Sequence, residues 1–131
     1  MNPMLALRQY QKVNGAAQTS EASPHRLVQM LMQGGLDRIA QAKGAMARND
    51  IAQRGVLIGK AIGIVGGLRE GLDLENHGES LAELDSLYTY MSRRLVEANA
   101  KNDSSILDEV ARLLITVKEG WDSVADPAQA V

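Results

Sequence analysis

The sequence predicts an all-α protein, an antiparallel up-down-up-down four-helix bundle preceded by a flexible N-terminal arm. Apolar residues recur at spacings of three and four in four successive segments, the links between segments are short, and no segment alternates apolar and polar residues as a strand would. Short links place successive helices antiparallel. In one domain of 131 residues, we expect residues 1–22 to form the arm, residues 23–125 the bundle and residues 126–131 a loose tail.

The first helix is expected to begin at Pro24. Ser23 can cap its N-terminus, and proline suits a first turn, where its missing N–H is not needed. The arm before it is polar and small from Asn14 to Ser20, so its order depends on what its apolar residues pack against. The core stripe of this helix consists of Val28, Leu31, Gly35, Ile39, Ala42 and Met46.

The second helix is expected to start at Asp50, because Gln53 follows three residues on, as in a capping box. Glycine recurs at every fourth position of this helix, although each helical glycine costs about 1 kcal/mol relative to alanine. The stripe consists of Ile58, Ala61, Val65, Leu68 and Leu72, and the glycines are Gly55, Gly59, Gly63, Gly67 and Gly71, with Gly66 beside them.

Two interpretations of these glycines stay open. They can form a small-residue ridge that lets neighbouring helices approach closely. Alternatively, they lie in a shallow groove on the outside of the bundle, flanked by Leu57, Ile64 and Leu68, which another helix could enter.

The fourth helix is expected to open after Asn102 and Asp103, and residues 100–102 link it to the third helix. The earlier links are residues 48–49 and 74–78. The third stripe consists of Leu81, Leu84, Tyr88, Met91, Leu95 and Ala98, and the fourth of Leu107, Val110, Leu114, Val117, Trp121 and Val124.

Several apolar residues are left over once each helix has supplied its stripe. Some of them widen the core, because a globular helix buries a broader face than a strict seam. Those that stay exposed together would form an interaction surface. The surplus residues are Leu57, Ile64, Leu87, Tyr90, Val96, Ile106, Leu113 and Ile115.

Composition argues against several classes of partner. Sixteen acidic and fourteen basic residues leave a near-neutral chain without a run of like charge that could follow a nucleic-acid backbone. The N-terminal apolar run is too short for a secretory signal, and no uninterrupted apolar stretch reaches the roughly 18 residues of a membrane helix. The chain has no cysteine, which fits a reducing compartment. We expect a cytoplasmic protein that binds no nucleic acid and does not insert into membranes.

Catalysis is not expected. A di-metal carboxylate bundle needs glutamate three residues before histidine, and neither His25 nor His77 has one. A phosphotransfer bundle needs an exposed mid-helix histidine near a lysine, whereas His25 falls in a first turn and His77 in a loop, as solvent or capping residues. The sequence also lacks a phosphate-binding loop and a nucleophile motif. We predict no enzyme activity, no metal and no cofactor.

Several stretches that together cover nearly the whole chain carry a resemblance to a known family. They are Tyr10 with Lys12 and Val13, residues 22–31, residues 58–62 through Leu68 to Asp73, Leu84 to Asn99, and Leu113 to Trp121. In these stretches the chain resembles the FliS family, the flagellin-specific export chaperones of bacterial flagella. One departure is Met32-Gln33-Gly34-Gly35, where the family usually has an aromatic residue and a small acidic-to-glycine run; methionine can fill an aromatic-sized gap.

The resemblance implies a cytoplasmic chaperone that binds the disordered C-terminal segment of flagellin, blocks its premature polymerisation and delivers it to the flagellar type III export gate. The chaperone would be a monomer or weak dimer. A helical-bundle phosphotransfer domain and a generic secretion adaptor with another client remain alternatives.

The predicted flagellin contacts combine the resemblance with the surplus apolar residues. By the resemblance, Tyr10 belongs to an arm that covers an apolar site in the free chaperone, although it could simply pin the arm. Asn99 could cap the third helix or meet a client backbone, and Trp121 is a core anchor or a client contact. Tyr88 lies on the core stripe. The predicted contacts are Tyr10, Leu57, Ile64, Leu68, Tyr90, Asn99, Ile106 and Leu113.

Overall fold

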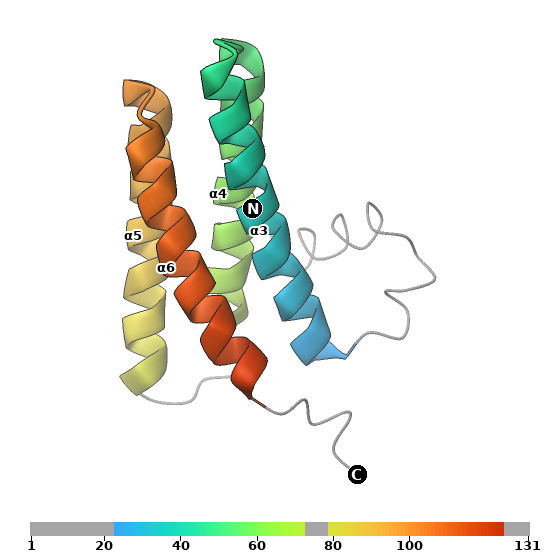
Figure 1. Ribbon diagram of the computed structural model, residues 1–131. Helices are drawn as coiled ribbons and strands as arrows, with labels where there is room; N and C mark the ends of the chain where they lie inside the picture. Colours follow the sequence, from blue (N-terminus) through green and yellow to red (C-terminus); the bar gives the residue numbers. More distant parts are fainter. Residues whose placement is uncertain (1–22, 73–78, 125–131) are drawn as a thin grey trace.

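The computed structural model describes residues 23–72 and 79–124, which form four α-helices (Figure 1). The helices are α3 (Pro24–Ala47), α4 (Ile51–Leu72), α5 (Glu79–Lys101) and α6 (Ser104–Ser123), and they run alternately up and down. The predicted all-α bundle is confirmed. The arm and the tail lie outside the described residues.

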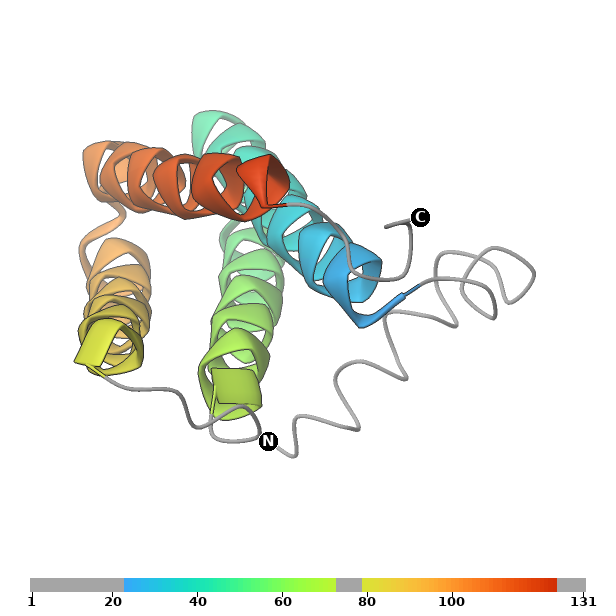
Figure 2. The same cartoon turned by 90° about the horizontal axis from the view of Figure 1, so that it is seen from below.

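The helices pack in a ring in chain order. α3 packs against α4 and α6, and α5 packs against α4 and α6, as the view from below also shows (Figure 2). The predicted stripes supply most of the buried core, and three apolar residues outside them, Met32, Ala45 and Ile106, are also buried. Val124 is an exception to the predicted stripes, because 57% of it is exposed at the end of α6.

The two tight links of the bundle share one design. Asn49 and Asn102 follow the ends of α3 and α5 in left-handed conformation, with φ of 58° and 51°. The next residues, Asp50 and Asp103, donate backbone N–H bonds to carbonyls five residues earlier, at 2.9 and 3.0 Å. This is the Schellman arrangement, in which asparagine tolerates the positive φ. Each Asn-Asp pair therefore ends one helix and begins the next.

The predicted helix starts are confirmed by side-chain caps. The Ser23 hydroxyl accepts from the Arg26 N–H at 3.1 Å, and the Asp50 carboxylate accepts from the Gln53 N–H at 3.1 Å. Asp103 accepts from the backbone N–H two residues on, at 2.9 Å. These bonds satisfy donors that have no partner inside the helix.

Arg54 of the neighbouring helix α4 contacts the α5–α6 link. Its Nε donates to Asn99 Oδ1 at 3.0 Å and its Nη1 donates to Asn102 Oδ1 at 2.7 Å. The Asn99 side chain therefore accepts from another helix.

The glycines of α4 were predicted either to form a ridge that lets neighbouring helices approach or to lie in a groove. The ridge interpretation is wrong at four of these positions, because a Cβ atom added there would meet nothing within 4 Å. The close approach lies instead at Gly35 of α3, where an added Cβ would stand 3.1 Å from Leu114 Cδ2 and 3.4 Å from Ile64 Cγ2. The four open positions are Gly55, Gly59, Gly66 and Gly71.

Of the described helices, α4 alone is long and apolar enough to cross a membrane by length and composition. The core helix of a bundle passes the same test. Here Ile58, Ala61 and Val65 of α4 are fully buried against the other helices.

Replacing the α4 cap tests the local origin of this start. Asp50→Ala is expected to lower the free energy of unfolding by about 1 kcal/mol, because the Gln53 N–H loses its acceptor. Asp50→Asn is the matched control, since asparagine caps about as well, and it should leave stability nearly unchanged. Urea denaturation measures both; equal losses in the two variants would contradict the capping role.

Candidate functional site

The bundle has an apolar cavity of about 480 Å³, partly open to solvent, at the end where α3 and α5 begin and α4 and α6 end. This volume lies in the range of small-ligand and side-chain binding sites. All four helices line it. The lining residues are Val28, Leu31 and Met32 of α3; Gly67, Leu68, Gly71 and Leu72 of α4; Leu81, Glu83, Leu84, Leu87 and Tyr88 of α5; and Thr116, Val117, Gly120, Trp121 and Val124 at the end of α6.

At this end α6 is attached to α3. The ring of His25 stacks on the ring of Trp121, with centroids 4.8 Å apart, and Trp121 Nε1 donates to the His25 carbonyl oxygen at 3.0 Å. Gln29 Nε2 donates to Asp122 Oδ1 at 2.8 Å. Both ribbon views accordingly show the end of α6 leaning toward the start of α3 (Figures 1 and 2).

These contacts correct one prediction. His25 is buried and stacked, and is not a solvent or capping histidine. His77 lies outside the described residues. Trp121 is half-buried, packs against the core as an anchor and also lines the cavity, and its contact with a client stays a prediction.

At the same end α5 is attached to α4 instead. Arg69 of α4 pairs with Asp85 of α5, with Nε and Oδ1 2.7 Å apart. At this end α5 stays beside α4, whereas α6 leans toward α3. The helices α5 and α6 therefore diverge here, and the core between them is not filled.

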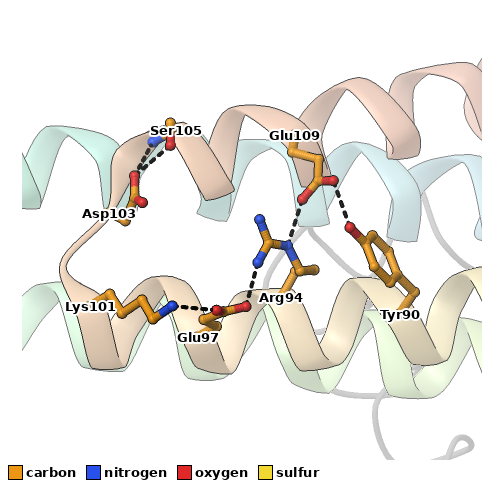
Figure 3. A network of polar contacts seen from close by, with 7 residues as sticks. All are labelled: Tyr90, Arg94, Glu97, Lys101, Asp103, Ser105 and Glu109. Atoms are coloured by element: carbon orange, nitrogen blue, oxygen red, sulfur yellow. Dashed lines mark hydrogen bonds and ion pairs between the residues drawn. The ribbon is translucent and has the colours of Figure 1, made fainter.

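Nearer the other end, a clamp joins α5 to α6 (Figure 3). Tyr90 donates its hydroxyl to Glu109 Oε2 at 2.7 Å, and Arg94 Nε donates to Glu109 Oε1 at 2.7 Å. Arg94 also pairs with Glu97, which accepts from Lys101 Nζ at 2.7 Å. We call Tyr90, Arg94 and Glu109 the clamp; it holds the two helices together before they separate toward the cavity.

The clamp is electrostatically consistent. Hydrogen bonds from Arg94 and then Tyr90 lower the pKa of Glu109, so its carboxylate is charged at neutral pH. The bond to Glu109 raises the pKa of Tyr90, which keeps the phenol protonated as a donor. Lys101 and then Arg94 lower the pKa of Glu97.

The structure disperses the predicted contact residues. Leu68 alone among them lines the cavity, and it is nearly buried. Ile106 is only 4% exposed and belongs to the core. Tyr90 is held in the clamp, and Asn99 by Arg54. Tyr10 lies outside the described residues.

The proposed groove along α4 is not formed as expected. Leu57 and Ile64 are half-buried and pack against the core, and Leu113 of α6 does the same. Ile64 points at α3, whereas Gly55 and Gly59 face open space. Gly55 and Gly59 therefore face away from Ile64, whereas Gly67 and Gly71 line the cavity together with Leu68.

Sequence reasoning missed the cavity because its lining residues look like ordinary core. Val28, Leu72, Leu84 and Val117 lie on the predicted stripes, yet all four are only half-buried. Leu87 was recognised as surplus, and it does line the cavity. One feature of the sequence could have indicated the cavity. The apolar stripes of all four helices continue to the same end of the bundle, and filling the core at that end would need unusually bulky side chains.

The described residues hold no cluster of three or more histidine, aspartate or glutamate side chains that could bind a metal ion. The arrangement offers an apolar binding site with few polar groups.

Comparisons with known proteins agree on one family. The family model described as "Flagellar protein FliS" matches residues 6–128. The chain is similar to the flagellar secretion chaperone FliSB of Pseudomonas aeruginosa, with 61% identity over 95% of this chain and 99% of that protein. It is also similar to the flagellar secretion chaperones FliS of Vibrio cholerae (40% identity, 91% of this chain and 88% of that protein) and Salmonella typhimurium (36%, 93% and 91%).

The clamp predicts a pH effect. Because the folded-state pKa of Glu109 is lowered, its charge stabilises the fold above its unfolded pKa, and that stabilisation is lost as pH falls through the folded-state value. Glu109→Gln should therefore lower the free energy of unfolding most at pH 7, and the difference from the parent should shrink below about pH 4. Glu119→Gln, at an exposed site on the same helix, should show no such change. Denaturation at both pH values measures this; a constant difference would contradict it.

Proposed function

This chain belongs to the FliS family, and we propose that it is a cytoplasmic flagellar secretion chaperone that binds the C-terminal segment of flagellin. By holding this segment, it prevents flagellin from polymerising early and brings it to the flagellar type III export gate. The protein acts as a binding module and not as an enzyme.

This proposal rests on one observation, the 480 Å³ apolar cavity between the ends of the four helices, several of whose lining residues are only half-buried. An amphipathic client helix can place apolar side chains in such a site, as in other helix-in-groove complexes. Each Leu or Ile buried there contributes about 1.5 to 3 kcal/mol before ordering costs are subtracted. The cavity therefore suits a client that supplies the missing part of a core.

Release follows from the same balance. A client segment that is disordered when free loses conformational entropy on binding, and this offsets part of the gross interface energy. The complex can then be tight enough to block polymerisation and still dissociate at the export gate without nucleotide hydrolysis.

We propose that the cavity is the main client site and that the flagellin contacts predicted from the sequence are secondary sites. Leu68 belongs to the cavity itself. Tyr10, Leu57, Ile64, Tyr90, Asn99, Ile106 and Leu113 stay predicted contributors, with Ile106 acting from the core. The phosphotransfer alternative loses support because His25 is buried against Trp121.

A steric block of the cavity tests this function. Gly120 lines the cavity and an added Cβ there meets nothing within 4 Å, so Gly120→Trp should fold while its side chain obstructs the site. Excluding one or two client side chains should weaken binding of the flagellin C-terminal segment about tenfold to a hundredfold. Isothermal titration measures the affinity.

The matched control is Gly59→Trp. Gly59 is equally open but lies away from the cavity, on the α4 face where the sequence suggested a groove. It should bind within about twofold of the parent. If Gly59→Trp abolishes binding and Gly120→Trp does not, the α4 face is the site. Undiminished binding of flagellin that lacks its C-terminal segment would instead favour a generic adaptor.

A further inference from the structure

Four residues with polar side-chain groups line the cavity, and two of them are already engaged. The Thr116 hydroxyl donates to the Arg112 carbonyl oxygen at 3.0 Å. Trp121 Nε1 donates to the His25 carbonyl oxygen at 3.0 Å. Two lining residues remain, Tyr88 and Glu83, both from α5.

Among the described residues, none forms a hydrogen bond with the Tyr88 hydroxyl, although Tyr88 is only 2% exposed. In that same part of the chain, no side-chain polar atom is both fully buried and unpaired, so the oxygen is not sealed inside the core. Because Tyr88 lines the cavity, we infer that its hydroxyl meets free space there.

An unpaired hydroxyl in an apolar cavity is available to form a hydrogen bond with a ligand. A polar group in an apolar site is costly unless it is hydrogen-bonded, so a ligand that supplies the partner gains affinity. Burial raises the pKa of Tyr88 to about 12, and the phenol is therefore neutral at physiological pH. It can donate to a carbonyl or accept from an amide.

Glu83 provides a free charge at the rim. It is exposed, and no ion pair or hydrogen bond with another described residue engages its carboxylate. The nearby acids Asp85 and Asp122 differ, because Asp85 pairs with Arg69 and Asp122 pairs with Lys118. Glu83 is thus the cavity-lining carboxylate that is available to a partner.

We propose that Tyr88 and Glu83 select the client: the cavity binds an amphipathic segment that brings a hydrogen-bonding polar group to the Tyr88 hydroxyl among its apolar side chains and a lysine or arginine to Glu83. This inference rests on the proposed function. It adds that recognition depends on a polar group and a cation at fixed positions as well as on apolar burial. A segment flanked by acidic residues at the same place is rejected.

Single-group substitutions test the two contacts on the full chain with the flagellin C-terminal segment as ligand. Tyr88→Phe removes one oxygen and keeps the ring, and should weaken binding about threefold to tenfold in isothermal titration. Glu83→Gln should weaken it about twofold to fivefold and reduce its dependence on salt. Glu119→Gln, at an exposed α6 carboxylate that does not line the cavity, should change neither.

A charge exchange identifies the client's side of the contact. Glu83→Lys should weaken the parent segment about tenfold, and replacing the client's basic residue by glutamate should recover most of that loss. No recovery at any basic position would overturn the Glu83 contact.

The outcomes separate this inference from the function. If the parent protein does not bind the segment, the proposed function fails. If the parent binds and Gly120→Trp does not, while Tyr88→Phe and Glu83→Gln bind as well as the parent, only the selection by these two residues is overturned. Tighter binding by Tyr88→Phe would also overturn it, because the hydroxyl would then serve another occupant in the free protein.

Discussion

The attachment of α6 to different helices along its length determines the shape of this protein. Its first half is held against α5 by the clamp and against α3 by the Lys43–Asp108 ion pair, whereas its end is held against α3 by the His25–Trp121 stack and by Gln29. Among the described residues, no hydrogen bond or ion pair joins this end of α6 to α5. The two helices therefore separate, and four apolar stripes end around a space that the described residues do not fill. The cavity therefore results from the contacts that attach α6 to α5 and to α3.

This arrangement explains why several residues at core positions are only half-buried. Leu84 and Val117 lie at core positions but keep part of their surface uncovered, and apolar surface left uncovered forgoes hydrophobic stabilisation. A bundle that closed completely would be more stable alone and would have nothing to offer a partner. Function of this kind is expected where local rules of packing are broken.

Much of the fold could be predicted because it depends on local patterns. Ser23, Asp50 and Asp103 act as caps through bonds to backbone groups two or three residues away, and the buried stripes follow helical spacing. The site could not be predicted in the same way. Its cavity depends on the tilt of α6, and that tilt is set by contacts between residues more than ninety positions apart, such as His25 and Trp121. The surplus apolar residues were a weaker guide, since Ile106 completes the core and Val96 stands apart with 57% of its surface exposed.

Trp121 is the only tryptophan of the chain and lines the cavity, so its fluorescence reports directly on whether a client enters there. The measurement is the emission maximum and acrylamide quenching of Trp121 as a tryptophan-free flagellin C-terminal segment is added to saturation. Entry of apolar client side chains predicts a shift of emission to shorter wavelength and reduced quenching. Unchanged emission and quenching in a saturated complex would show that the client binds elsewhere, and would contradict the account.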